Sequence, residues 1–308
     1  MAQRPFRFGV QVSKTPDRRS WIKLAKQAED AGISVLTLPD HFSDQLAPVP
    51  ALMAAADATK SLRVGALVWD NDYKHPAVLA KELATIDLLS DGRLEVGLGA
   101  GWEKVDYDRT GIRYDPPGVR IDRFEEAVTI IKGFFGDGPV NFTGRHYEIT
   151  DYDALPKPIQ KPPPLLIGGG GRRILTIAAR EADIVGVNGD LRAGRVTAEV
   201  VRSMSADSID EKIAVVNQAA AGRAIELNVR SFLVKVTNER NTAADQIASM
   251  LGFTRADVLE TPFALLGTPD QIVDDLRRRR ERWGFSYVII GQEDLDSFAP
   301  VIAALAGT

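Results

Sequence analysis

Four consecutive glycines, Gly168 to Gly171, form the segment with the clearest capacity to bind a ligand. They follow the apolar residues Pro164–Ile167 and precede Arg172 and a helical pattern of apolar residues. Glycine leaves the backbone open to a ligand, the first N–H groups of a helix have no partner within the helix, and arginine adds positive charge. The pattern therefore predicts a strand, a glycine turn and a helix start that together bind a phosphate group. A flexible turn that is merely rich in glycine is the alternative.

His41 is the second candidate, because an imidazole can exchange a proton or donate a hydrogen bond at about pH 7. It follows the apolar run Val35–Leu38, and Asp40 stands beside it. The carboxylate would orient the imidazole, so we predict that both residues are catalytic. The alternatives are that His41 caps the following loop and that Asp40 caps a turn.

The chain has three histidines and no cysteine, which limits metal chemistry. His75 precedes a proline at a predicted helix start, and His146 lies in a predicted hairpin, so both are expected to be structural. A three-histidine site would need all three to converge from unrelated parts of the chain. We therefore predict no metal site, no disulfide and no cysteine nucleophile.

Apolar, β-branched runs bounded by turn residues predict eight strands, with helical patterns between them. Eight such units in 308 residues favour a closed (β/α)8 barrel, also called a TIM barrel, over an open sheet. We expect one domain over residues 1–308, with insertions near 136–164, containing a hairpin, and near 190–225, beginning with a mobile lid. The predicted strands are Phe8–Val12, Val35–Leu38, Leu62–Val68, Leu94–Leu98, Leu165–Gly168, Ile184–Val187, Leu227–Val236 and Tyr287–Ile290.

The carboxyl ends of the strands in such a barrel form one mouth that holds the ligand. Asp40, His41 and Asn188 follow predicted strands, as the glycine turn does, and should face this mouth. Three alternate glycines in Gly97–Gly101 lie at the end of the fourth strand, with a spacing and position that differ from the dinucleotide-binding fingerprint. They would let a flat ring approach the backbone, or they serve tight packing.

Composition points to small molecules as partners. Lys and Arg total 38 against 42 Asp and Glu, a net charge of −4, and no basic block suggests nucleic acid or an anionic membrane. No stretch approaches the ~18 apolar residues of a membrane-spanning helix, and no apolar run follows the N-terminal residues. We therefore expect a cytoplasmic protein that binds a small-molecule substrate, with no nucleic-acid and no membrane partner.

The segment from His75 to Trp102, with Leu62–Gly65 before it, resembles the core signature of the bacterial luciferase-like monooxygenase superfamily. The glycine turn, Ala182–Gly186 and Gly267–Ile272 add to the resemblance, which extends from about residue 6 to residue 291. It implies a (β/α)8 barrel with insertions, and a cofactor that is either FMN or the deazaflavin coenzyme F420. Dimers are common in that superfamily, so it also implies a homodimer.

Within the superfamily, Pro39–Phe42 is similar to the Asp-His pair of the F420-dependent oxidoreductase branch. By this resemblance His41 lies beside the carbon that gains or loses hydride, and Asp40 anchors the deazaflavin ring. The segment Ala66–Val68 matches the part that bulges behind the ring, often with a non-proline cis peptide, and the glycine turn would take the cofactor phosphate. The predicted cofactor site comprises Asp40, His41, Ala66, Leu67, Val68, Gly99, Gly101, Gly168, Gly169, Gly170, Gly171, Arg172 and Asn188.

Two positions depart from the sugar-phosphate dehydrogenases of that branch, which have a tryptophan and a glutamate where this chain has Gln45 and Trp102. The resemblance therefore implies reduction of an activated double bond or carbonyl by reduced F420, or the reverse oxidation, rather than oxidation of glucose 6-phosphate. His41 or solvent would then supply the proton. An FMN-dependent monooxygenase that receives reduced flavin from a separate reductase is the alternative, and a non-catalytic flavin-binding protein is a third.

Overall fold

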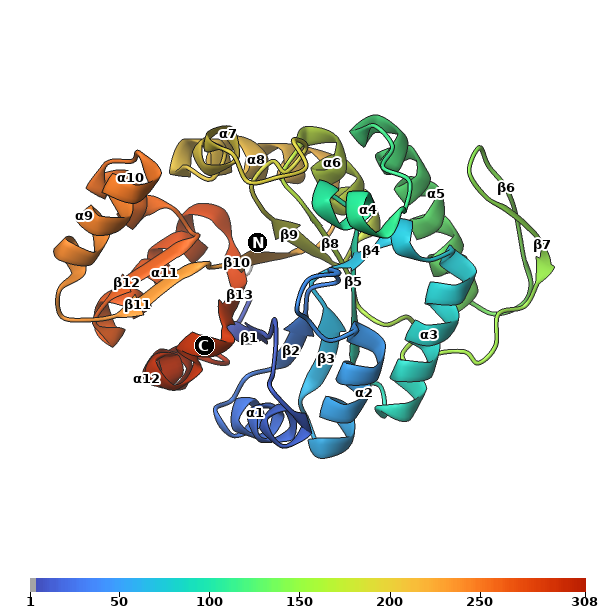
Figure 1. Cartoon of the computed structure of the whole chain (residues 1–308), viewed down its shortest axis with the longest axis horizontal. Helices are drawn as coiled ribbons and strands as arrows, with labels where there is room; N and C mark the ends of the chain where they lie inside the picture. The colour runs from blue at the N-terminus through green and yellow to red at the C-terminus, as the bar shows by residue number, and fades with distance from the viewer. Residues whose placement is uncertain (1–3) are drawn as a thin grey trace.

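Eight parallel strands close into a barrel in the computed structural model, which describes residues 4–308 (Figure 1). In order around the ring they are β1 (Arg7–Gln11), β2 (Val35–Leu38), β3 (Arg63–Ala66), β5 (Leu94–Gly99), β8 (Leu165–Gly169), β9 (Ile184–Val187), β10 (Glu226–Arg230) and β13 (Phe285–Gly291). The last strand, β13, pairs with β1, and this pairing closes the ring. The predicted (β/α)8 barrel is therefore confirmed.

A long helix follows each barrel strand along the chain and covers the outside of the barrel. These helices are α1 (Arg18–Asp30), α2 (Pro48–Ala58), α3 (Pro76–Leu89), α5 (Pro117–Phe135), α6 (Arg172–Glu181), α8 (Ala206–Ala220), α11 (Pro269–Trp283) and α12 (Leu295–Leu305). Short 3-10 helices, η1 (Asn71–Tyr73) and η2 (Gln292–Asp294), precede α3 and α12. Among residues 4–308, no helix has both the length and the apolar character needed to cross a membrane.

The barrel strands are apolar on both faces, which is why the sequence shows near-continuous hydrophobic runs. Every residue of β2 and of β13 is buried. The helices begin at sequence signals that fix their first turns: Asp17 accepts a hydrogen bond from the Ser20 N–H before α1, and Thr268 and Gln271 form a capping box at α11. These signals decide which residues remain in the loops at the strand ends.

The third predicted strand ends earlier than expected. Instead of reaching Val68, β3 stops at Ala66, and the peptide bond between Leu67 and Val68 is cis. The short strand β4 (Trp69–Asp70) then pairs with β5. The non-proline cis peptide that the resemblance implies is therefore present in this segment.

The seventh predicted strand, Leu227–Val236, is wrong beyond Arg230. There β10 ends, and β11 (Leu233–Val236) leaves the barrel to pair with β12 (Ala264–Gly267) in a parallel two-stranded sheet. This small sheet packs with α9 (Arg240–Leu251) and α10 (Arg255–Glu260), at the left of Figure 1. The N–H of Ser231 still donates to a barrel strand, at Ile289, whereas that of Leu233 donates to Phe263, so the pairing partner changes between them.

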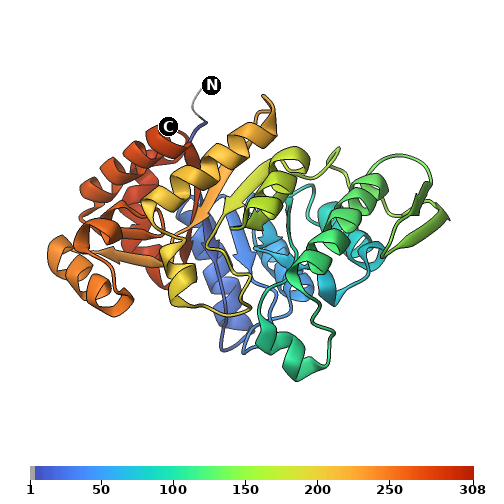
Figure 2. The same cartoon turned by 90° about the horizontal axis from the view of Figure 1, so that it is seen from above.

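Both predicted insertions contain regular structure. Near residues 136–164, β6 (Val140–Thr143) and β7 (Glu148–Tyr152) pair antiparallel, so the predicted hairpin is confirmed. It projects from the side of the barrel, beyond α5 (Figures 1 and 2). In the other region, an irregular segment from residue 189 to residue 197 precedes α7 (Ala198–Arg202) and α8. The division of the chain into one domain stays a prediction.

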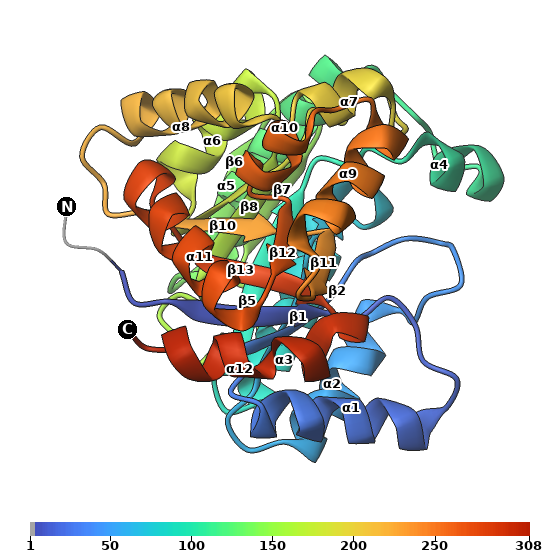
Figure 3. The same ribbon diagram turned by 90° about the vertical axis from the view of Figure 1, so that its left-hand side faces the viewer.

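The two ends of the described chain lie together at the amino ends of the strands. The N–H of Phe6 donates to the carbonyl of Thr308 at 3.0 Å. At the same end Arg7 is paired with Glu95 at 2.8 Å and with Glu226 at 2.7 Å, so charged pairs fill the interior there. In Figure 3 the start of β1 and the end of α12 lie on the left, whereas α4 (Lys104–Thr110) lies on the right, at the carboxyl ends of the strands.

Candidate active site

A cavity of about 440 Å³ opens at the carboxyl ends of the barrel strands. Of the residues predicted to bind the cofactor, only Ala66 does not line it, because Ala66 is buried within β3 with 3% of its surface exposed. The predicted residues that line the cavity are Asp40, His41, Leu67, Val68, Gly99, Gly101, Gly168, Gly169, Gly170, Gly171, Arg172 and Asn188. The fold thus brings the histidine after the second barrel strand and the glycine turn after the fifth to one cavity.

The glycine turn joins β8 to α6 and keeps its backbone accessible. The N-cap of α6 is Gly171, which has no side chain to accept a hydrogen bond from the first turn of the helix. The N–H groups of that turn are therefore available to another acceptor. A Cβ atom added at Gly171 would lie 3.6 Å from its nearest neighbour, Asp190, which is an ordinary van der Waals contact without a clash. At Gly170 a Cβ would instead collide with the carbonyl oxygen of Gly189. The turn therefore fits an anion such as a phosphate, and Arg172 adds charge beside it.

Asp190 lies near this turn and would repel an anion if it were unpaired. Arg192 neutralises it, because its Nε donates to the carboxylate at 2.9 Å. Burial raises the pKa of Asp190, but the hydrogen bonds from Arg192 outweigh burial and hold that pKa below its usual value. An anion at the turn would therefore meet a neutral ion pair.

Gly97 and Gly99 serve close packing between strands. A Cβ at Gly97 would collide with the carbonyl oxygen of Ala66, and one at Gly99 would collide with the Val68 side chain. The two glycines thus let the segment after β3 lie directly against β5. The packing alternative holds at these two positions, and the direct approach of a flat ring to the glycines stays a prediction.

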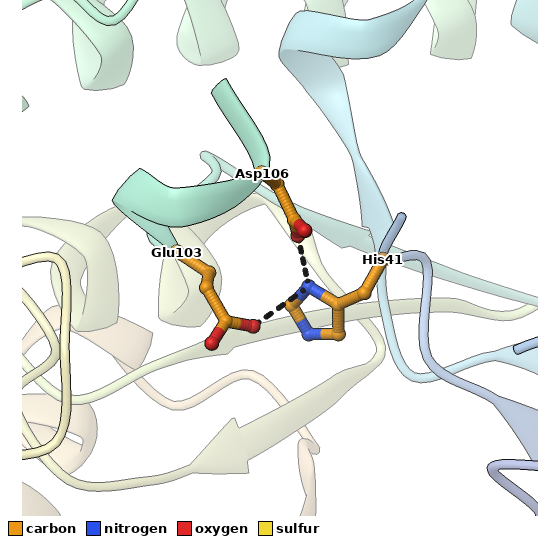
Figure 4. A group of neighbouring side chains, drawn as sticks. All are labelled: His41, Glu103 and Asp106. Atoms are coloured by element: carbon orange, nitrogen blue, oxygen red, sulfur yellow. Dashed lines mark hydrogen bonds and ion pairs between the residues drawn. The ribbon is translucent and has the colours of Figure 1, made fainter. Parts of the chain in front are cut away.

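His41 is held by two carboxylates at the start of α4, as Figure 4 shows. Its Nδ1 lies 2.7 Å from Oδ2 of Asp106 and 3.2 Å from Oε2 of Glu103. Because ionised carboxylates only accept hydrogen bonds, Nδ1 must be the donor. Within residues 4–308, Nε2 has no hydrogen-bond partner, and His41 lines the cavity. Asp40, which was expected to orient the imidazole, forms no hydrogen bond with it, and its carboxylate instead accepts from the Asp70 N–H.

Other hydrogen bonds also hold the Asp106 carboxylate in position. Only 5% of its surface is exposed; its Oδ2 accepts from the Tyr73 hydroxyl at 3.2 Å and its Oδ1 from the Phe42 N–H at 3.3 Å. Burial and the nearby carboxylates raise the pKa of Tyr73 far above its ordinary value, so the hydroxyl keeps its proton and continues to donate.

Sequence reasoning missed both carboxylates that hold His41. The available signal was a pair of acidic residues, Glu103 and Asp106, three positions apart directly after the fourth barrel strand. That spacing places two side chains on one face of a helix.

Asp40 belongs to a separate group of buried carboxyls. Its Oδ2 accepts from the Asp70 N–H at 3.2 Å, and the Tyr107 hydroxyl donates to Asp70 at 3.0 Å. Burial raises the pKa of Asp40, and it raises the pKa of Asp70 to about 7. Asp40 and Asp70 both line the cavity, so its wall near His41 carries carboxyl groups that hold protons more strongly than usual. A catalytic role for Asp40 stays a prediction.

The group around His41 could also admit a divalent ion, since the ligand atoms of His41, Glu103 and Asp106 lie within 4.8 Å of one another. Both carboxylates, however, point to the same nitrogen, and 2.7 Å between Nδ1 and Asp106 is a hydrogen-bond distance. An ion at roughly 2.0–2.2 Å from each ligand would take the lone pair of Nδ1 in place of its proton. The arrangement seen is therefore that of a hydrogen-bonded histidine.

The chain belongs to the luciferase-like monooxygenase family, whose profile matches residues 4–287. It is 31% identical over 248 residues to the FMNH(2)-dependent dimethylsulfone monooxygenase of Pseudomonas putida, which covers 77% of this chain and 65% of that enzyme. It is 26% identical over 333 aligned residues to the 5,10-methylenetetrahydromethanopterin reductase of Methanopyrus kandleri, covering 92% of both. Among solved structures, the coenzyme F420 dependent tetrahydromethanopterin reductase of that organism matches with a TM-score of 0.77 over 98% of both chains at 18% identity.

These relatives are oxidoreductases, and they divide between two cofactors. One is named for reduced FMN and another for coenzyme F420. Family membership therefore supports an oxidoreductase with a flavin or a deazaflavin cofactor.

Proposed function

We propose that this chain is an F420-dependent oxidoreductase that transfers a hydride between the deazaflavin and a small organic substrate. The main support is that one cavity is lined by His41, by the glycine turn and by Leu67 and Val68. The alignment with the methanopterin reductase covers 92% of both chains, whereas that with the dimethylsulfone monooxygenase covers 65% of the latter. We take the near-complete alignment with the reductase as support for the deazaflavin, while the higher identity to the FMN-dependent enzyme, 31% against 26%, supports the second candidate below.

The residues of the cavity fit such a cofactor. Its volume of about 440 Å³ lies within the range of ~300–1,000 Å³ that is usual for small-molecule sites. The open turn Gly168–Gly171 and Arg172 would hold the phosphate, the Leu67–Val68 segment would support one face of the ring, and Asp40 would anchor its edge. When bound there, F420 would supply or accept the hydride.

His41 would move the accompanying proton. Because Nδ1 donates to Asp106, the lone pair of Nε2 is the one available to a substrate in the cavity. The negative charges of Asp106 and Glu103 stabilise the imidazolium that forms when Nε2 takes a proton. The absence of a glutamate at position 102 therefore does not leave the site without an acid–base group, since two carboxylates act through His41.

An FMN-dependent monooxygenase is the second candidate, and one structural feature favours it. The segment after β9 lies over the cavity: Gly189, Leu191 and Arg192 line it, and the Gly194 carbonyl accepts from the Lys104 N–H at 3.0 Å. A cover of this kind would exclude water from the site, as oxygen chemistry on a reduced flavin requires. A separate reductase would then have to supply the reduced cofactor.

Parallel titrations of the purified full chain with F420 and with FMN, followed by fluorescence quenching, separate the two candidates. We expect F420 to bind at micromolar concentration or below and FMN to bind at least about tenfold more weakly, a difference of ~1.4 kcal/mol. Arg172→Gln should weaken F420 binding about tenfold, whereas Arg277→Gln, which removes the same charge from an exposed helix face, should not. Micromolar FMN binding without a response to F420 would refute the proposal.

The role of His41 has its own test. His41→Ala should leave F420 affinity within about tenfold of the parent, because the glycine turn carries most of the binding. Hydride transfer to a surrogate with an activated double bond, such as cyclohex-2-enone, should fall by roughly 10²-fold, the scale of a positioned acid–base group. An unchanged rate would reduce His41 to a structural residue.

We also propose that the protein is a homodimer, with α3 at the interface. Val78 and Leu89 are 52% and 60% exposed, and they lie about three turns apart on the same face of this helix. Sedimentation of the full chain should give twice the monomer mass of 33.6 kDa, and Leu89→Glu should shift it toward the monomer. A monomer at tens of micromolar would contradict this assignment.

A further inference from the structure

Arg230 is the last of three polar residues that β10 directs into the barrel. Alternate residues of a strand share a face, and Glu226, Asn228 and Arg230 alternate with apolar residues. At the amino end, Glu226 is paired with Arg7 at 2.7 Å, and in the middle Nδ2 of Asn228 donates to the Tyr287 carbonyl at 3.1 Å. The first two polar groups are therefore matched within the barrel. Asn228 and Arg230 both line the cavity, and Arg230 is the charged one of the two.

The guanidinium of Arg230 is held in a defined orientation. Its Nε donates to Oε1 of Gln11 at 3.0 Å, and its Nη1 donates to the Ser231 carbonyl. Gln11 is fixed in turn, since its Nε2 donates to the Leu67 carbonyl at 3.0 Å. A guanidinium has five N–H donors, so three remain for another acceptor.

No carboxylate among residues 4–308 forms an ion pair with Arg230, although the residue is half-buried. Burial lowers its pKa, and Glu293 and Asp294, on η2, act in the opposite direction only from beyond ion-pair distance. Partial burial of a charge without a counter-ion is unfavourable, so the position is suited to receive an anion.

The other arginines of the cavity wall are already committed, apart from the one at the glycine turn. Arg173 is paired with Asp122, and Arg192 is paired with Asp190. Arg120, like Arg230, lies over an aromatic ring and has no ion pair among residues 4–308, but it is only 2% exposed and donates to the backbone carbonyls of Asp115 and Gly101, so it is less accessible to a substrate. In the proposed function Arg172 serves the cofactor phosphate. Arg230 is therefore the cation left for the substrate.

We propose that Arg230 binds a carboxylate group of the substrate, so that the enzyme acts on carboxylic acids that carry the reacting double bond or carbonyl. This rests on the proposed function, which places the cofactor at the glycine turn and the reacting carbon beside His41. The planar guanidinium matches a carboxylate with parallel hydrogen bonds. A phosphate dianion carries about twice the charge, and Arg230 is a single cation with two of its donors in use.

Benzoate and benzamide provide a matched pair of probes, because they have the same size and differ in charge. We would titrate each into the full chain by calorimetry, both without cofactor and with F420 added. The parent should bind benzoate at least about tenfold more tightly than benzamide. Arg230→Gln should lose most of this preference, Arg230→Lys should keep part of it, and Arg277→Gln should keep it in full.

Equal binding of the two probes by the parent protein would overturn the proposal, and this comparison needs no variant that must fold. Unchanged benzoate affinity in Arg230→Gln would also overturn it. So would a loss of F420 affinity in that variant with the benzoate preference intact, because Arg230 would then bind the cofactor. If F420 does not bind but the benzoate preference is present and depends on Arg230, the proposed function fails and the carboxylate site stands.

Discussion

The proton on His41 should lie on Nδ1, and this can be observed directly. Asp106 determines the position of this proton, because its carboxylate is nearly buried and lies 2.7 Å from Nδ1. Glu103 contributes less, because it lies 3.2 Å away and is one-third exposed. A hydrogen bond to a charged group contributes about 1.5–3 kcal/mol, which corresponds to a preference of roughly 10- to 150-fold for the Nδ1–H tautomer. Asp106→Asn replaces the charged acceptor with a neutral one and should cut this preference by about tenfold.

Long-range ¹H–¹⁵N spectra report which ring nitrogen of each histidine carries the proton, and the chain has only three histidines to assign. His75 is an internal reference, because its Nδ1 accepts from the Ala77 N–H at 3.2 Å and its proton must therefore lie on Nε2. We would record the spectra at about pH 8.5, which favours the neutral form of a histidine ring. The spectra should show opposite tautomers for His41 and His75.

The variants extend this measurement. Asp106→Asn should move the His41 signals toward a mixture of tautomers and leave those of His75 unchanged. Asp108→Asn, on the same helix but paired with Lys104 in solvent, is the matched control and should change neither ring. The reasoning is refuted if the parent protein shows His41 protonated on Nε2, as in His75.

Three further outcomes follow from the packing and from the buried charges. Gly170→Ala should destabilise the fold in urea by about 1–3 kcal/mol, because the added Cβ meets the Gly189 carbonyl oxygen, whereas Gly118→Ala, with no atom within 4 Å, should not; equal effects would show that the turn can shift. Burial raises the pKa of Asp70 from 3.8 to about 7, so between these pH values the folded state holds more protons than the unfolded state. The free energy of unfolding should therefore fall as the pH rises from 3.8 to 7, by at most about 4 kcal/mol. Asp70→Asn should make the free energy of unfolding less dependent on pH in that range. Lys212→Met removes the Nζ that donates to the Asn188 carbonyl at 2.8 Å and to that of Ser203, so proteolysis within residues 189–204 should quicken; resistance equal to that of the parent would mean that these bonds do not hold the segment.

The barrel could be predicted because its signals are local. Buried parallel strands such as β2 and β13 leave continuous apolar runs, and caps such as Asp17 and Thr268 mark the helix starts. The error at the seventh strand has a local cause as well. The apolar pattern continues through Leu233, and a run of this kind does not show that the chain has changed its pairing partner at Ser231.

Only part of the candidate site could be predicted from local sequence signals. Residues that directly follow strands, such as His41 and Gly169, could be assigned to one mouth because the barrel geometry fixes where strands end. The hydrogen-bond partner of His41 could not be predicted, because Asp106 is 65 positions away in the sequence. It lies on a short helix whose placement depends on tertiary contacts. Sequence adjacency pointed instead to Asp40, whose side chain belongs to the group around Asp70.

The helix that holds His41 is fastened to the segment that lies over the cavity. At the start of α4, where backbone N–H groups have no partner in the helix, the Lys104 N–H donates to the Gly194 carbonyl at 3.0 Å. At its other end this segment is tied down by Lys212, through the Asn188 carbonyl. Because Asp106 on α4 decides which nitrogen of His41 carries the proton, releasing the segment would both admit water and loosen the imidazole. Exclusion of solvent and orientation of the acid–base group therefore depend on the same few backbone contacts.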